Sequence, residues 1–225
     1  MVQRFNPRAY QAPAIEHIIK HPRCALFIPM GGGKTVSTLT ALNDLSIVDN
    51  VYPVLVIAPK RVATSTWPDE VNKWDHLKHL SVSAILGSAE QRLKALYRKA
   101  DIYTINYENI PWLVEKLAGE WPFKTIVADE STKLKSFRLR KGSMRAKALA
   151  KVAHQSERFI GLTGTPSPNG IKDLWGQLYF VDKGKRLGRS FESFRNRWFR
   201  AERVGTSEFA VEPVSYTHLR AHETL

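Results

Sequence analysis

The chain has 225 residues, 43% of them hydrophobic and 24% charged, which is typical of a protein that folds around one packed core. This composition excludes a disordered or fibrous chain, and the longest aliphatic run, residues 54–58, is far short of the roughly 20 residues of a membrane helix. Lys and Arg number 34 against 21 Asp and Glu, a net charge of +13 that indicates either a polyanionic partner or a surplus of surface lysine.

Cys24 is the only cysteine in the sequence, which excludes an internal disulfide and a cysteine-built zinc site. The N-terminus is polar and lacks the layout of a secretory signal, so we expect a cytoplasmic protein of a bacterium or a phage-infected host. His17 and His21 have helical spacing, and we interpret them as a solvated helix face rather than a pair of metal ligands.

Short apolar runs alternate along the chain with stretches at helical spacing, such as Trp67, Val71 and Trp74. Ser88, with Gln91 three residues later, predicts a capping box at the start of another helix. This order predicts an α/β fold with a mostly parallel sheet flanked by helices. The predicted strands are residues 24–28, 54–58, 82–86, 102–105, 125–128 and 159–162.

A glycine-rich loop follows the first predicted strand: Gly31, Gly32 and Gly33 stand directly before Lys34 and Thr35. Backbone amides of such a loop can surround a phosphate, while the lysine reaches the β- and γ-phosphates and the threonine hydroxyl binds Mg²⁺. The general motif has a further glycine where Ile28 stands, so a flexible turn is the alternative. The strand before the loop and the helical pattern after it favour a site for ATP and Mg²⁺.

Two carboxylates, Asp129 and Glu130, follow the predicted strand 125–128, at the strand end where ligands bind in open α/β sheets. We expect Asp129 to hold Mg²⁺ and Glu130 to orient and deprotonate an attacking water. The alternative is an acidic turn that caps the next helix. The glycine loop upstream favours the catalytic interpretation, in which Lys34, Asp129 and Glu130 act together.

A basic block lies between Ser131 and Lys151, where there is no acidic residue. Such a block attracts phosphate and favours nucleic acid as the polyanionic partner. Its members are Lys133, Lys135, Arg138, Arg140, Lys141, Arg145, Lys147 and Lys151.

A third motif, Gly161-Leu162-Thr163-Gly164-Thr165-Pro166, follows the last predicted strand. With residues 29–35 and Asp129-Glu130-Ser131-Thr132, it resembles the three lobe 1 motifs of superfamily 2 helicases, most closely the Swi/Snf-type double-stranded DNA translocases. The resemblance covers about residues 8–182. It implies a single RecA-like P-loop lobe, the binding of ATP and Mg²⁺, and ATP-driven motion on double-stranded DNA.

The resemblance also implies roles for single residues. Gln11 of the segment Arg8-Ala9-Tyr10-Gln11 reads adenine, and Thr35 and Asp129 hold the metal. Residues implied to bind the nucleotide are Arg8, Gln11, Met30, Gly31, Gly32, Gly33, Lys34 and Thr35. Residues implied to contact DNA or to couple it to the nucleotide are Pro59, Lys60, Thr163, Gly164 and Thr165.

One departure from the family pattern concerns the second motif, which usually runs Asp-Glu-Ala-His and here has Ser131 and Thr132 in the last two positions. The two carboxylates remain, so the nucleotide chemistry is retained. The residue lost is the histidine that in the family contacts the third motif and the second lobe and so transmits hydrolysis into movement. Such a variant fits a phage-type branch.

Beyond Asp182 the chain becomes basic, and the spacing of Phe191, Phe194 and Trp198 predicts an amphipathic helix that docks its aromatic side on the lobe. We therefore divide the chain into the lobe, 1–182, a basic helical extension, 183–213, that leads toward a second RecA-like lobe missing from this chain, and a non-native tail, 214–225.

The sequence is compatible with three functions. The favoured one is an ATP-binding lobe of a DNA-dependent ATPase, either helicase or translocase, which hydrolyses ATP slowly without the second lobe's arginine. The others are a catalytically idle nucleic-acid-binding fragment and a small P-loop phosphotransferase. Adjacent Asp129 and Glu130 favour water over another phosphate acceptor.

Overall fold

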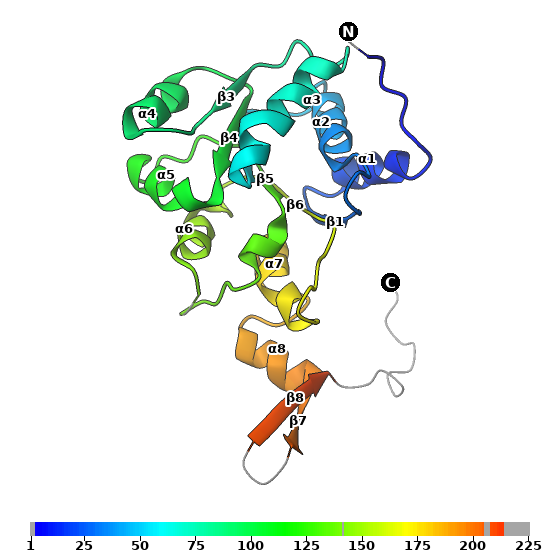
Figure 1. The fold of residues 1–225 in the computed structure, drawn as a ribbon, viewed down its shortest axis with the longest axis vertical. Coiled ribbons are helices and arrows are strands. Elements are labelled where there is room, and N and C mark those ends of the chain that lie inside the picture. The colour runs from blue at the N-terminus through cyan, green and yellow to red at the C-terminus, as the bar shows by residue number, and fades with distance from the viewer. Residues whose placement is uncertain (1–2, 141, 205–207, 214–225) are drawn as a thin grey trace.

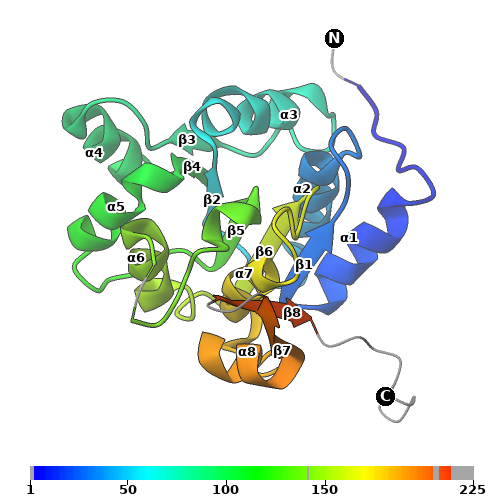
Figure 2. The same cartoon turned by 60° about the horizontal axis from the view of Figure 1, so that its bottom comes forward.

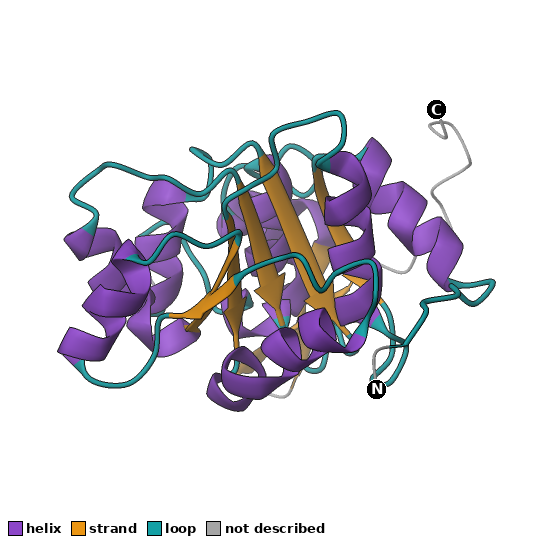
Figure 3. Ribbon diagram, turned by 90° about the horizontal axis from the view of Figure 1, so that it is seen from above, coloured by secondary structure: helices purple, strands orange, loops and turns teal. Residues whose placement is uncertain are grey.

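The computed structural model describes residues 3–140, 142–204 and 208–213. Its main part is one six-stranded sheet in the order β1-β6-β5-β2-β4-β3, in which all neighbouring strands are parallel. Figure 3 shows the strands between two layers of helices. The strands are β1 (Arg23–Phe27), β2 (Val54–Ala58), β3 (Val82–Ala84), β4 (Ile102–Asn106), β5 (Thr125–Asp129) and β6 (Arg158–Thr163).

The predicted α/β fold is confirmed, and each predicted strand corresponds to an observed one whose ends differ from the prediction by at most two residues. The helices are α1 (Gln11–Lys20), α2 (Lys34–Leu45), α3 (Trp67–Lys73), α4 (Ala89–Tyr97), α5 (Ile110–Lys116), α6 (Met144–Val152), α7 (Lys172–Asp182) and α8 (Phe191–Trp198). The capping box before α4 is also present, since Ser88 and Gln91 each bond to the other's backbone amide. Across the described ranges, no helix is both long and apolar enough to cross a membrane.

Alternate residues of the strands pack on opposite faces of the sheet, as the pleat requires. Val54, Val56 and Ala58 of β2 pack with α1, α2 and α3, whereas Leu55 and Ile57 pack with α4 to α7. Figure 1 shows these two groups of helices on either side of the strands. Burial on both faces explains why the strands appear in the sequence as continuous apolar runs.

The parallel arrangement places the carboxyl ends of all six strands at one edge of the sheet. The glycine loop follows β1, the carboxylates end β5, and the segment 164–170 follows β6. Because β5 lies between β6 and β2 in the sheet, motifs that are far apart in the sequence meet at its end.

The prediction of a helical extension over 183–213 is right for α8 and wrong beyond Trp198. Phe199–Val204 (β7) and Glu208–Pro213 (β8) form an antiparallel hairpin, which lies with α8 below α7 in Figures 1 and 2. Phe and Val recur in both segments and favour strands. As expected, α8 docks through its aromatic side: Phe194 is buried, and the Phe191 ring lies 5.8 Å from that of Trp175 on α7. The tail 214–225 lies outside the described residues.

Arg23 of β1 binds four main-chain carbonyls around the C-terminal ends of two helices. Its guanidinium donates to Val181 and Phe180 of α7 at 3.0 and 2.8 Å. It also donates to Ala153 and Ser156 after α6 at 3.1 and 2.8 Å. A helix leaves its last carbonyls without partners, and one planar cation here satisfies several of them.

We expect Arg23→Ala to lower the free energy of unfolding by about 2–4 kcal/mol, because it leaves buried carbonyls without donors. Urea unfolding followed by circular dichroism measures the change. The exposed Arg98→Ala is the matched control and should stay within about 0.5 kcal/mol of wild type. Equal midpoints for both variants would contradict this structural role.

Candidate nucleotide site

The glycine loop is held in a strained form that glycine permits. Gly31 and Gly33 have φ angles of 78° and 72°, and α2 begins directly after them at Lys34. A Cβ on Gly33 would lie 2.2 Å from Nε2 of Gln11, so a side chain at this position would displace the Gln11 amide from the loop. The amides that open α2 therefore face outward at a helix N-terminus, which favours an anion.

Lys34 folds back over the loop, where its Nζ donates to the carbonyl oxygens of Ile28 and Pro29 at 2.9 and 3.3 Å. Thr35, the next residue, is half-buried and lines the same cavity as Lys34. The acceptors of Lys34 are thus neutral carbonyl oxygens. A phosphate, which carries a full negative charge, would accept a stronger hydrogen bond from the same ammonium group.

Asp129 carries the most constrained carboxylate of the site. Its Oδ2 accepts a hydrogen bond from the indole N–H of Trp67 at 3.0 Å, and its Oδ1 accepts one from the amide of Glu130 at 3.0 Å. Burial raises the pKa of Asp129, while the Trp67 hydrogen bond and the Lys34 charge act in the opposite direction. Tyr107 donates its hydroxyl to the Asp129 main-chain oxygen at 2.8 Å and so secures the strand end.

Glu130 follows in the left-handed conformation, with φ 55°, which is uncommon for a residue with a side chain. The backbone turn ends β5 and lets Glu130 line the cavity beside Asp129. Such a strained residue is found most often where function depends on its direction.

Gln11 opens α1 and lies against the glycine loop. Its Oε1 accepts a hydrogen bond from the amide of Arg8 at 2.9 Å, and its Nε2 lies 3.4 Å from the carbonyl oxygen of Gly32. The side chain is buried although it is polar. Arg8 itself is exposed at the rim.

These groups surround one cavity of about 680 Å³. The cavity brings together most residues that the sequence predicts for the nucleotide: Arg8, Gln11, Met30, Gly31, Gly33, Lys34, Thr35, Asp129 and Glu130. Gly32 lies within the loop, and Pro59 and Lys60 lie outside the cavity walls.

The motif Thr163-Gly164-Thr165 packs behind the loop rather than in the cavity. A Cβ on Gly164 would lie 3.3 Å from the amide nitrogen of Met30. Thr163 is fully buried, and its hydroxyl accepts the amide of Thr165 at 3.1 Å. The third motif thus contacts the glycine loop through its backbone.

Sequence reasoning missed one wall of the cavity, formed by residues 3–5 beside the end of α3. Gln3 lies opposite Trp74 in an isolated parallel bridge, in which its amide donates to the Lys73 carbonyl oxygen and its carbonyl oxygen accepts from the Asp75 amide. The Phe5 ring lies edge-on to Trp74 with centroids 5.2 Å apart. The Trp74 indole N–H donates to Glu70 at 2.6 Å. No local pattern joins these residues, because the pairing spans about seventy positions.

The donors present fit Mg²⁺ held together with a nucleotide. Asp129 and Thr35 offer oxygen ligands, which Mg²⁺ prefers. Within the part of the chain that the structure describes, no three His, Cys, Asp or Glu side chains gather as a metal site.

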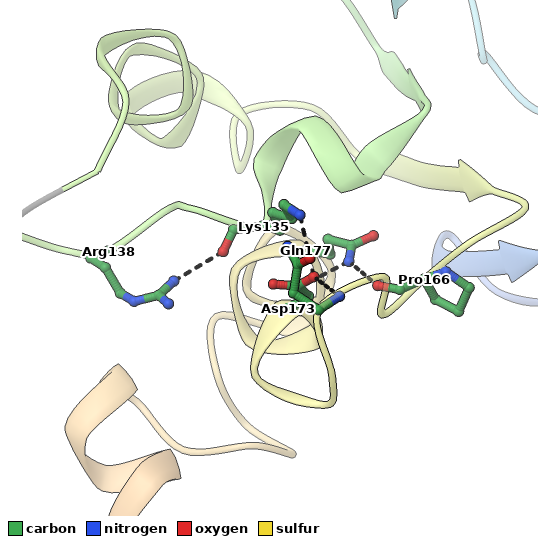
Figure 4. Close-up of polar contacts among 6 residues, drawn as sticks. Lys135, Arg138, Pro166, Asp173 and Gln177 are labelled. Carbon is green, nitrogen blue, oxygen red and sulfur yellow. Dashed lines mark hydrogen bonds and ion pairs between the residues drawn. The ribbon is translucent and has the colours of Figure 1, made fainter. Parts of the chain in front are cut away.

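Ser131 makes a contact that its alanine counterpart in the family pattern could not make. Its hydroxyl donates to Oε1 of Gln177 on α7 at 2.9 Å, and both side chains are buried. The Gln177 amide donates in turn to the carbonyl oxygens of Pro166 at 2.6 Å and Asp173 at 3.0 Å. Figure 4 shows Gln177 between Pro166 and Asp173. Gln177 thereby joins Ser131 of the second motif to Pro166, the last residue of the third.

The basic block is only partly free to meet phosphate. Lys135 pairs with Asp173 at 3.4 Å, and Arg145 pairs with Glu108 at 3.1 Å. Arg138 lies 3.5 Å from the centroid of the Phe191 ring and donates to the Lys135 carbonyl oxygen (Figure 4). Lys133, Arg140 and Lys151 are exposed. Lys141 lies outside the described residues.

Comparison with known proteins defines the family. The model of the SNF2-related domain matches residues 15–212, so the chain belongs to that family. The putative protein p41 of Acyrthosiphon pisum secondary endosymbiont phage 1 is 51% identical over 97% of this chain and 48% of its own length. The yeast (Saccharomyces cerevisiae) ISWI chromatin-remodeling complex ATPase ISW1 is 29% identical over 68% of this chain and 13% of its own length.

Solved structures agree with this assignment. The Sulfolobus solfataricus SWI2/SNF2 ATPase core in complex with dsDNA matches with a TM-score of 0.72 and 27% identity, over 87% of this chain and 39% of its own. The UvsW helicase of bacteriophage T4 shares the fold, with a TM-score of 0.60 at 15% identity over 80% of this chain and 59% of its own. The chain thus spans about half or less of the curated relatives that it matches.

We expect the Ser131–Gln177 contact to appear in a double-mutant cycle. Ser131→Ala alone should lower the free energy of unfolding by about 1–2 kcal/mol, because it leaves the Gln177 oxygen buried without a donor. Adding Gln177→Leu should cost less than the sum of the single changes by about 1 kcal/mol. Urea unfolding of the four proteins gives the coupling. Ser131→Ala combined with Gln91→Ala at the exposed α4 cap should be additive, and additivity in both pairs would exclude the contact.

Proposed function

We propose that this chain is the ATP-binding lobe of a DNA-dependent ATPase, a helicase or a double-stranded DNA translocase. One observation carries the proposal: the glycine loop with Lys34 and the carboxylates of Asp129 and Glu130 line a single cavity, although some ninety-five positions separate them. Membership in the SNF2-related family supports the same function. A bacterial or phage-infected cytoplasm is the setting we expect, since the phage protein p41 is a relative.

In this proposal the loop amides and Lys34 hold the phosphates, and Gln11 binds the adenine from the opposite end. Thr35 and Asp129 hold Mg²⁺, which when bound neutralises charge on the phosphate oxygens. Glu130 orients a water and accepts its proton as the water oxygen bonds to the γ-phosphorus and the bond from that phosphorus to ADP breaks. Lys34 meets charge that develops on the γ-phosphoryl oxygens.

The DNA side of the proposal rests on the exposed edge around Lys60 and on the basic block. The Sulfolobus relative was solved with dsDNA, which favours a duplex as the partner. In our proposal Pro59 and Lys60 contact the phosphate backbone, and Thr163 to Thr165 couple these contacts to the glycine loop. In our proposal a second RecA-like lobe completes the ATPase. In support, this chain matches only 39% of the length of the Sulfolobus ATPase core.

Lys34→Ala should weaken Mg-ATP binding by about 10–100-fold, because it removes a charged hydrogen-bond donor worth about 1.5–3 kcal/mol. Calorimetric titration of the intact chain measures the affinity. Lys94→Ala, an exposed change on α4, is the control and should bind as wild type does. Equal affinity in Lys34→Ala and wild type would remove the basis for the nucleotide site.

Binding of duplex DNA should show little sequence preference and a steep dependence on salt. Each phosphate contact contributes about 0.9 to the slope of log affinity against log salt, so several contacts give a slope of several units. Lys60→Ala should remove one phosphate contact and so reduce that slope by about 0.9. Fluorescence anisotropy with two unrelated duplexes tests both points, again with Lys94→Ala as control. A slope near zero would contradict a backbone-binding surface.

A further inference from the structure

The hydrogen bond from Trp67 to Asp129 joins two elements that lie 62 positions apart in the sequence. Trp67 is completely buried and Asp129 is 6% exposed, so neither group can exchange this partner for bulk water. With Oδ1 held by the Glu130 amide, both carboxylate oxygens are fixed in direction. The indole and the neighbouring amide therefore together set how the carboxylate faces the cavity, and the indole is the partner that comes from a distant element.

Trp67 is also the first residue of α3 and directly follows the π-helical turn Val62–Thr66 (η1). Turns of this kind are rare and are found frequently at functional sites. The buried Thr104 hydroxyl ties the turn to the sheet by donating to the Ala63 carbonyl oxygen at 2.7 Å, and the Ala63 side chain is buried in the core at the same point. Any displacement of the turn beyond that point reaches Trp67 through the main chain.

The two sides of this turn face different surroundings. Val62 and Thr66 line the nucleotide cavity. Lys60, Arg61 and Thr64 are exposed. A phosphate group bound by Lys60 and Arg61 would thus act on a segment that forms part of the cavity wall.

We propose that Trp67 is a positioning residue that orients Asp129 for the metal and transmits to it the binding of a DNA phosphate at residues 59–66. This inference rests on the proposed function, because it requires Mg-ATP in the cavity and duplex DNA at Lys60. It goes beyond that function by assigning the link between the two ligands to one indole N–H. Outer contacts to metal ligands typically change metal affinity by about 10–100-fold when they are removed.

The test compares nucleotide affinity of the intact chain in Mg²⁺ and in EDTA, using a non-hydrolysable ATP analogue. Trp67→Phe removes the N–H donor and keeps an aromatic ring. We expect the affinity of the variant for the analogue to be about tenfold lower than that of wild type in Mg²⁺. In EDTA the two proteins should bind the analogue equally. A loss of equal size in both conditions would indicate general damage to the fold and would overturn the proposal.

Trp175→Phe is the matched control, since Trp175 is equally buried and its indole N–H also donates to an oxygen, the Gly188 carbonyl at 2.9 Å. We expect the ratio of the affinities in Mg²⁺ and EDTA to stay at the wild-type value in this control. If Trp175→Phe lowers the ratio as much as Trp67→Phe does, the effect does not come from the contact with Asp129 and the proposal fails.

A second experiment tests whether Trp67 transmits DNA binding to the nucleotide site, by measuring affinity for the analogue with and without a short DNA duplex. In wild type the duplex should raise the affinity for the Mg-bound analogue several-fold, and reciprocity requires the analogue to raise duplex affinity equally. Trp67→Phe should bring this factor close to one and leave duplex affinity without nucleotide unchanged. No coupling in wild type, or equal coupling in the variant, would overturn the proposal.

A measurement on wild type alone covers the case in which Trp67→Phe does not fold. Hydrogen exchange of the amides of residues 62–67 should slow when the analogue binds with Mg²⁺, and less so when it binds in EDTA. Exchange that does not respond to Mg²⁺ would overturn the proposal. Failure of the proposed function is distinct, because the analogue would then not bind at all and Lys34→Ala would behave as wild type.

Discussion

Burial of the Asp129 carboxylate at the end of the central strand β5 is the constraint on which the rest of the site depends. A carboxylate removed from water must be hydrogen-bonded or paired, or it becomes protonated. Here its partners come from three parts of the chain: the Glu130 amide, the Trp67 indole and the charge of Lys34. Tyr107 holds the main chain at the same point. The elements that supply these groups are thereby brought to one edge of the sheet.

The same edge joins the three motifs into one packed unit. Gly164 lies against the backbone of the glycine loop, and Ser131 reaches the segment after Thr165 through Gln177. In the family pattern alanine and histidine follow the acidic pair, and Ser131 stands here at the alanine position. Ser131 and Gln177 form a neutral, buried hydrogen bond whose other Gln177 groups are also bonded, and such networks hold a unique arrangement when every member has a partner.

The charge of the chain divides into two parts with different physical roles. Arg23, Lys135, Arg138 and Arg145 bind carbonyls, carboxylates or an aromatic face within the fold. Exposed cations such as Lys60, Arg61, Lys133 and Arg140 remain for an outside anion. The net charge of +13 therefore overstates the surface that is free for nucleic acid. Since the internal cations satisfy helix ends and acidic side chains, they contribute to stability rather than to association.

By itself the sequence determined the features that depend on neighbours along the chain. Apolar runs specify buried strands, Gly31 to Lys34 require a loop that turns into a helix, and Asp129 with Glu130 places acid at a strand end. The tertiary structure alone decided which distant side chains meet. Trp67 bonds Asp129, Ser131 bonds Gln177, and residues 3–5 close the cavity, because the packing of helices and loops around the sheet brings these distant segments together. The hairpin after Trp198 was missed for a related reason: a strand pair is stabilised by its cross-strand partner, which a local periodicity does not contain.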